Sequence, residues 1–301
     1  MRELVRLLAP AKLNLYLRVL GRRPDGYHEL ETLFERIDLA DELTFEAQPH
    51  ALRVICNDPS LPCDDTNLVL TAARLLQAAT RTTQGATIHL TKRIPIAAGL
   101  GGGSSDAATT LVGLNRLWHL GWSTAQLREL ACQVGSDVPF FLEEAVFAIG
   151  RGRGELLEPV RDGRALVHVF VTPNIRLSTK EIFSQAHFPL TAPWASISMV
   201  LHALRNGSLG ELAKGLYNDL QPEAIRRCPV ITEIQSRLRM AGCIGTLISG
   251  SGPTVFGLCQ DATQAMAIAK QLRAIGSSDW RIGVVQTQAP RGQQPRAGSL
   301  R

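Results

Sequence analysis

Alternating apolar and polar residues dominate the beginning of the chain and predict long extended strands. Further along, apolar residues recur at the spacing of one helical face, as at Leu68, Ala72 and Leu76. Strands and helices are mixed without strict alternation, which favours an α+β fold over a parallel α/β sheet. The predicted strands cover residues 4–21, 31–47, 51–57, 87–95, 164–173, 245–250, 254–259 and 280–288, and the predicted helices cover residues 64–80, 107–120, 124–135, 196–207, 210–220, 222–242 and 261–276, with a further helix beginning at the capping box 178–181.

The length of 301 residues suggests two domains or one large one. With 45% hydrophobic and 20% charged residues, the composition is that of a soluble folded protein. No uninterrupted apolar run approaches the ~18 residues that a membrane span requires, and the first ten residues are too short for a signal peptide. The six cysteines form no CxxC pair, so we interpret them as reduced residues, several of them in the core, of a cytoplasmic protein.

The net charge of +5 raises the question of nucleic-acid binding. Three of the arginines lie in the Gly-, Pro- and Gln-rich end of the chain, and the remainder carries only +2 with no long basic run. We therefore expect neither a nucleic-acid nor a membrane partner, and a monomer or weak homodimer. The predicted division is an N-terminal domain over 1–160, a C-terminal domain over 161–287 and a disordered basic tail over 288–301.

The most informative segment is residues 95–108, PIAAGLGGGSSDAA. Its four glycines stand between a predicted strand and a helix, where backbone N–H groups can converge on an anion without interference from Cβ atoms. Ser104 and Ser105 are expected to open the helix, whose N-terminus favours a phosphate. A flexible linker is the alternative, and the amphipathic helix that follows argues against it. Ser104 stands where a Walker A loop needs Lys and a Rossmann fingerprint needs Gly, so neither motif is present.

Two charged residues are candidates for catalysis. Lys12 lies in an alternating strand, where its ammonium could stabilise a developing alkoxide, although an outward-facing strand lysine is the simpler interpretation. Asp137 follows Gly135 and Ser136, so it could be an ordinary turn or helix-capping residue. The apolar residues 138–142 beside it would partly desolvate its carboxylate, as suits a general base.

Two turns complete the set of candidate segments. Residues 25–28, DGYH, predict a turn that carries an aromatic ring and an imidazole, which together can stack on a base and bind its edge. Residues 250–252, GSG, predict a tight turn between two apolar strands, and a simple hairpin is the alternative interpretation.

At this point the sequence resembles the GHMP kinases. Residues 95–108 are similar to the phosphate-binding loop of that family, with Ala97 and Ala98 where Gly or Met is often found. The segments APAKLNLYL (9–17) and ISGSGPTVFGL (248–258) match in the expected order. Segments 10–34, 134–142, 177–183 and 218–222 resemble the branch of the family that acts on 4-diphosphocytidyl-2-C-methyl-D-erythritol.

The resemblance covers about residues 10–285 and implies a fold and an activity. The expected fold has an N-terminal domain like ribosomal protein S5 domain 2 and a ferredoxin-like C-terminal domain, with the active site between them. The expected reaction is phosphorylation of the substrate 2-hydroxyl by ATP with Mg²⁺, in the non-mevalonate isoprenoid pathway. Mg²⁺ would be carried by ATP, with Ser105 as a candidate ligand and no dedicated metal site.

The resemblance also assigns roles to residues. Lys12 matches the catalytic lysine of the family and Asp137 matches the catalytic base. The remaining assignments are ATP and phosphate binding by Pro95, Ala97, Ala98, Gly99, Leu100, Gly101, Gly102, Gly103, Ser104, Ser105, Asn67 and Asn115; substrate binding by Asn14, Tyr27, His28 and Phe183, with Tyr27 and Phe183 on either side of the cytosine; and support of the phosphate loop by Gly250, Ser251 and Gly252.

Two rival functions remain to be weighed. Another GHMP kinase, such as a homoserine or mevalonate kinase, is disfavoured by the DGYH segment and by the segment around Phe183. A non-catalytic nucleotide-binding regulator would be expected to lose Lys12 or Asp137, and both are present.

Overall fold

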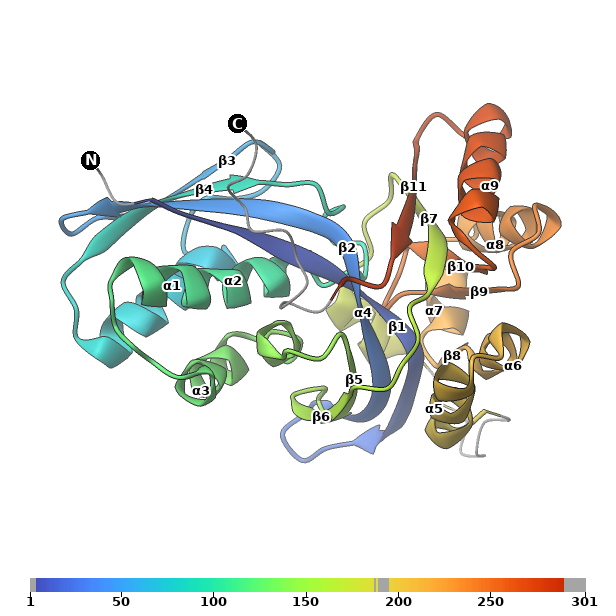
Figure 1. Cartoon of the computed structure of the whole chain (residues 1–301), viewed down its shortest axis with the longest axis horizontal. Coiled ribbons are helices and arrows are strands. Elements are labelled where there is room, and N and C mark those ends of the chain that lie inside the picture. The colour runs from blue at the N-terminus through green and yellow to red at the C-terminus, as the bar shows by residue number, and fades with distance from the viewer. Residues whose placement is uncertain (1–3, 187, 189–194, 290–301) are drawn as a thin grey trace.

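The computed structural model describes residues 4–186, 188 and 195–289. Two long antiparallel strands, joined by a turn at residues 23–27, organise the first part of the chain, as the alternating pattern predicts (Figure 1). They belong to a seven-stranded sheet with the path β3-β4-β2-β1-β8, in which β5 also pairs with β2 and β6 with β5. The strands are β1 (Leu4–Arg22), β2 (His28–Gln48), β3 (Leu52–Cys56), β4 (Gly85–Thr91), β5 (Phe147–Gly152), β6 (Leu156–Val160) and β8 (Tyr217–Asn218).

Helices pack against one face of this sheet and bury its apolar side chains (Figure 1). Gly113 lets α2 approach β2 closely, because a Cβ there would collide with the ring of Phe45. A capping box formed by Ser123 and Gln126 opens α3. These helices are α1 (Leu68–Thr80), α2 (Gly102–Leu117), α3 (Thr124–Val134) and a short 3₁₀ helix (Pro139–Leu142).

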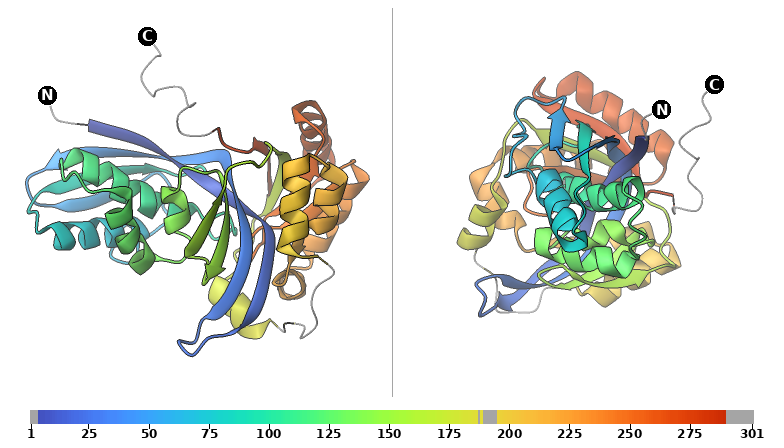
Figure 2. Two further views of the ribbon diagram at one scale, coloured as in Figure 1. Left: turned by 60° about the horizontal axis from the view of Figure 1, so that its bottom comes forward. Right: turned by 90° about the vertical axis from the view of Figure 1, so that its left-hand side faces the viewer.

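The second part of the chain forms a four-stranded antiparallel sheet in the order β11-β7-β10-β9. One face packs on α7, α8 and α9, and the other meets α5, α6 and the β1–β2 hairpin (Figures 1 and 2). The predicted α+β class is therefore confirmed. The elements are β7 (Val167–Pro173), α4 (Thr179–Gln185), α5 (Ile197–Asn206), α6 (Leu209–Gly215), α7 (Gln221–Arg227), α8 (Val230–Met240), β9 (Gly245–Ile248), β10 (Val255–Cys259), α9 (Ala262–Ile275) and β11 (Trp280–Gln286).

Two predicted helices were wrong in detail. The helix expected over 210–220 ends at Gly215, because Tyr217 and Asn218 pair with the free edge of β1 as β8. The helix expected over 222–242 breaks at Pro229, which has no N–H to donate and restricts the residue before it. The structure also contains a hairpin for which the sequence predicted no strands, β5–β6 over residues 147–160.

The predicted division at residues 160 and 161 stays a prediction. β6 ends at Val160 and β7 begins at Val167, while β8 returns to the first sheet from the second half of the chain. Of the tail predicted over 288–301, residues 290–301 lie outside the described part. Within the described ranges, no helix combines the length and apolar character that crossing a bilayer demands.

A buried polar network joins the two sheets. Glu35 of β2 is fully buried; its Oε2 lies 2.8 Å from Nε2 of His168 on β7, and its Oε1 accepts a 2.6 Å hydrogen bond from the Thr287 hydroxyl. The same hydroxyl accepts from the backbone N–H of Leu166 at 2.8 Å. Since buried polar groups need partners, this network fixes how β2 meets the second sheet.

Replacing Glu35 by Ala leaves His168 and Thr287 buried without this acceptor. We expect the free energy of unfolding, measured by urea denaturation, to fall by roughly 3 kcal/mol. Glu46→Ala on the same strand is the control: its carboxylate is one-third exposed and lies 3.6 Å from His89, so the loss should stay below about 1 kcal/mol. Equal losses in the two variants would show that the network does not join the sheets as described.

Candidate active site

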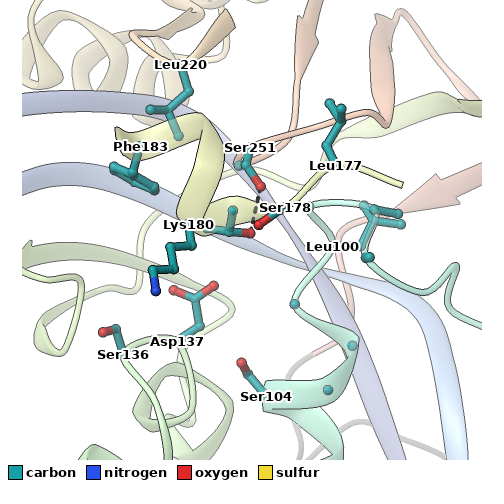
Figure 3. Close-up of a pocket in the computed structure, with 18 of the residues that line it drawn as sticks. Leu100, Ser104, Ser136, Asp137, Leu177, Ser178, Lys180, Phe183, Leu220 and Ser251 are labelled. Carbon is teal, nitrogen blue, oxygen red and sulfur yellow. Dashed lines mark hydrogen bonds between the residues drawn. The ribbon is translucent and has the colours of Figure 1, made fainter. Parts of the chain in front are cut away.

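A cavity of about 1320 Å³ lies where the two parts of the chain meet. The segments that line it include the β1–β2 hairpin, residues 61–68 at the start of α1, the glycine loop before α2, the turn at Ser136 and Asp137, the beginning of α4, and the turn at Gly250 and Ser251 (Figure 3). Residues far apart in the sequence therefore converge on one space, and most of the predicted site residues are among them.

The glycine loop connects β4 to α2 and presents the start of that helix to the cavity. Gly99 and Gly101 have positive φ values of 77° and 68°, which favour glycine. Gly101 is the N-cap and has no side chain to satisfy the first N–H groups of α2, so they remain available to an anion. The helix begins at Gly102, two residues before Ser104, which corrects the expectation that the serines open it.

The second glycine turn packs directly on this loop. The Ser249 hydroxyl donates to the carbonyl of Gly99 at 2.8 Å, and a Cβ on Gly99 would collide with the Ser249 carbonyl oxygen. Asn218 donates to the carbonyl of Gly250 at 2.8 Å and so fixes the turn from β8. Gly250 and Ser251 line the cavity, whereas Gly252 shapes the turn behind it. The structure thus places the turn against the loop, where support was predicted.

Lys12 is buried, with 3% of its surface exposed, so the outward-facing interpretation is wrong. The pairing of β1 with β2 shifts register on both sides of Lys12 and Asn14, and such bulges re-aim side chains. The Lys12 ammonium donates to Oδ1 of Asn14, and its backbone N–H donates to the carbonyl of Leu100 at 3.0 Å. Gly101 leaves the space that the Lys12 side chain crosses, since a Cβ there would lie 2.9 Å from Cγ of Lys12.

Asp137 faces Lys12 from the turn between α3 and the 3₁₀ helix. Its Oδ2 lies 3.7 Å from Nζ of Lys12, and its side chain is one-third exposed to the cavity. Val138, not Asp137, is the N-cap of the 3₁₀ helix, so the capping interpretation is wrong. Burial lowers the pKa of the Lys12 ammonium, and the Asp137 carboxylate opposes that shift.

The opposite end of the cavity is aromatic. The rings of His28 and Phe183 stack with centroids 5.4 Å apart, and Phe188 approaches His28 edge-on at the same separation. Tyr27 lies at the tip of the hairpin, half exposed, with the guanidinium of Arg153 4.8 Å from its ring centre. Phe183 therefore contacts His28 and not Tyr27 in this structure. Burial lowers the pKa of the His28 imidazole, and Arg22 lowers it further, which favours the neutral ring.

The two asparagines predicted near the adenosine have different positions. Asn67 lines the cavity but also caps α1, because its Oδ1 accepts from Val69 at 3.0 Å. Asn115 lies elsewhere: its side chain makes two hydrogen bonds to the backbone of Trp122, at 2.9 and 3.0 Å, and holds the loop after α2. Its predicted role in nucleotide binding is therefore wrong, and a helical Asn at a chain reversal explains its presence.

The position of Ser105 decides whether it can be the predicted magnesium ligand. Its hydroxyl is completely buried, has no hydrogen-bond partner among the described residues, and does not line the cavity. A metal bound to phosphates in the cavity would not reach this oxygen, so the residue does not fit the role. Across the described residues, no group of three His, Cys, Asp or Glu side chains is placed to hold a metal ion. We assign no side chain to Mg²⁺.

A charged network that no sequence motif indicated lies beneath the glycine loop. The Lys92 ammonium contacts Asp41 and lies 2.8 Å from Oδ2 of Asp106 on α2, while Oδ1 of Asp41 accepts from the backbone of Ile94 at 2.8 Å. The network ties β2, the end of β4 and α2 together. A signal existed, since only five of the 32 basic residues are lysines and three of them, Lys12, Lys92 and Lys180, line this cavity.

Comparisons with known proteins decide the family. The models of the GHMP kinases N terminal domain and of the GHMP kinases C terminal match residues 67–144 and 200–278. The 4-diphosphocytidyl-2-C-methyl-D-erythritol kinase of Pelotomaculum thermopropionicum is 43% identical, over 94% of this chain and 98% of its own. The chain belongs to the GHMP kinase family. A kinase of the same name from Gloeobacter violaceus is 40% identical to it, over 94% of each chain.

Solved structures agree with this placement. A crystal structure of 4-(cytidine 5'-diphospho)-2C-methyl-D-erythritol kinase is 37% identical in sequence and has a TM-score of 0.77. The match covers 93% of this chain and 99% of that one. A homoserine kinase from Cytophaga hutchinsonii has a TM-score of 0.76 at 19% identity, over 96% of each chain, and shares the fold alone. The kinase therefore has the predicted GHMP fold and belongs to the branch that the sequence resembles.

The network around Lys92 predicts a pH-dependent contribution to stability. Burial raises the pKa of the Asp106 carboxyl from 3.8 to about 7, so the folded kinase holds a proton there that the unfolded chain has lost. Stability from this group therefore falls as pH rises between those two values. In urea denaturation, Asp106→Asn should gain stability relative to the wild type as pH rises from about 5 to 8. Exposed Asp279→Asn should show no such trend, and a pH-independent difference for Asp106→Asn would contradict the assignment.

Proposed function

We propose that the kinase transfers the γ-phosphoryl group of ATP to the 2-hydroxyl of 4-diphosphocytidyl-2-C-methyl-D-erythritol, a step of the non-mevalonate isoprenoid pathway. One observation carries the proposal. The 3.7 Å pair of Lys12 and Asp137 faces the phosphate loop in a cavity whose other end is aromatic. A single cavity thus offers a base, a cation, an anion site and a surface for stacking.

Asp137 is the proposed general base. Its partly exposed carboxylate faces the cavity, so it can accept the proton of a substrate hydroxyl as the oxygen attacks phosphorus. The Lys12 ammonium, buried beside it, stabilises the negative charge that develops on the attacking oxygen and the phosphoryl group. Phosphoryl transfer requires mainly positioning and electrostatic stabilisation, and the contacts of Lys12 with Asn14 and Asp137 help to position the two groups.

The phosphates of ATP are proposed to bind the N–H groups at the start of α2 and the preceding loop. The loop is preorganised, because it packs on the Gly250 turn and rests on the Lys92 network. Mg²⁺ would arrive with ATP, and its chemistry there would be to neutralise phosphate charge. Asn67 is proposed to lie near the adenosine, since it borders the cavity on the side of α1.

The aromatic end is proposed to bind the cytosine. His28 offers a neutral imidazole that can donate to or accept from the edge of a base, and Phe183 and Tyr27 offer rings for stacking. Phe183 stacks on His28 in this structure. The proposed sandwich therefore requires the cytosine to enter between the rings of Tyr27 and Phe183. Homoserine and mevalonate have no base to place there, which favours the cytidyl substrate.

The base is tested by Asp137→Asn, which keeps the size of the side chain but removes the proton acceptor. We expect kcat to fall by about 10²–10⁴-fold, because general-base catalysis contributes that much. ATP affinity, measured by calorimetry, should change little. Asp162→Asn, an exposed residue paired with Arg205 outside the cavity, is the control and should keep wild-type kcat. A kcat near the wild-type value in the Asp137 variant would contradict the assignment of Asp137 as the general base.

A further inference from the structure

Five basic side chains line the cavity, and their partners differ. Among the described residues, three of the five lie within ion-pair distance of a carboxylate, and two, Arg22 and Lys180, do not. At Arg22 and Lys180, no carboxylate of the described residues competes with an anionic ligand. The paired ones are Lys12 with Asp137, Lys92 with Asp41 and Asp106, and Arg153 with Glu155.

Lys180 lies on α4, which a hydrogen bond to the Gly250 turn and one buried side chain anchor. It is the second residue of α4, where Thr179 hydrogen-bonds to the Ser251 hydroxyl at 2.9 Å and Ile182 is fully buried. Glu181, its neighbour, is paired with Arg227 at 2.7 Å and so does not neutralise it. A lysine in the first turn is not stabilised by the helix dipole, because the N-terminal end of a helix is the positive one. Lys180 is exposed, so its charge costs little there, but neither a carboxylate among the described residues nor the helix dipole favours a cation at this position.

The direction of the side chain supplies a reason. Figure 3 shows Lys180 extending from α4 toward the turn that carries Ser136 and Asp137, across the cavity that all three line. Phe183 follows one turn later on the same side of α4 and stacks on His28. Lys180 thus lies between the aromatic end and the catalytic carboxylate.

The order of groups in the proposed substrate matches this order of residues. Cytosine stands at one end, the methylerythritol with its 2-hydroxyl at the other, and the diphosphate links the two. With the base at His28 and Phe183 and the hydroxyl at Asp137, the diphosphate must cross the space that Lys180 enters. Arg22 pairs in register with His28 and so belongs to the base end.

We propose that Lys180 binds the diphosphate of the cytidyl substrate. It is a specificity residue, since it contacts a group that homoserine and mevalonate lack. The inference rests on the proposed function and deepens it. The Lys180 ammonium is compact and sits on a flexible side chain, so it can adjust to the position of a bound phosphate.

Lys180→Met tests the proposal in steady-state kinetics. The KM for the cytidyl substrate should rise by about 10–100-fold, because a charge-assisted hydrogen bond is lost, while kcat and the KM for ATP stay near wild type. Lys180→Arg should restore most of the affinity. Lys270→Met on α9, exposed and outside the cavity, removes the same charge and should change none of these values.

Calorimetry with CDP and cytidine separates a diphosphate contact from a general effect on the site. The wild type should bind CDP more tightly than cytidine, and Lys180→Met should lose most of that preference while its affinity for cytidine is kept. An unchanged preference, or a rise in the KM for ATP alone, would overturn the assignment of Lys180. If the wild type neither binds CDP nor turns over the cytidyl substrate, the proposed function itself fails.

Discussion

The burial of one ammonium group, that of Lys12, constrains the whole site. A charge removed from water is costly unless other groups solvate it, and Lys12 finds Asn14 on its own strand and Asp137 on a distant turn. Its side chain can pass only because Gly101 has no Cβ, and a Cβ on Gly250 would lie 3.2 Å from its Nζ. The strand β1, two glycine turns and the turn after α3 must therefore meet around a single side chain.

Backbone-to-backbone packing follows from that constraint. The glycine loop and the Gly250 turn pack so closely that a Cβ on Gly99 would collide with the Ser249 carbonyl oxygen. The second sheet therefore sets the position of the loop that opens α2. Beneath the loop, Lys92 joins two buried carboxylates from different elements. These contacts preorganise the loop that we propose as the phosphate site, and preorganisation lowers the entropic cost of binding ATP there.

The pattern of apolar and polar residues predicted the elements correctly where that pattern is strong. The alternation in β1 and β2 and the helical spacing in α1 and α2 are continuous, so those elements agree with the structure. The two-residue strand β8 has no pattern of its own, because it exists only where the edge of β1 is free. Pro229 was a visible signal for the break between α7 and α8, since proline disrupts a helix interior.

For the site, motifs placed Lys12, Asp137 and the glycine loop in one cavity, and their roles stay proposals. Single asparagines and lysines carry too little information: Asn115 was wrongly assigned, and Lys92 and Lys180 were overlooked. The contact between Phe183 and His28 depends on side-chain packing across 155 residues of sequence, which no local pattern encodes.

The proposed site unites phosphoryl transfer with recognition of a cytidyl group. The most direct test of this proposal is a coupled ADP-release assay with 4-diphosphocytidyl-2-C-methyl-D-erythritol, homoserine and mevalonate as acceptors. Stacking of one base is worth ~1–3 kcal/mol, so we predict a kcat/KM for the cytidyl acceptor at least about tenfold above that for either other acceptor. Equal or greater turnover of homoserine or mevalonate would contradict the account.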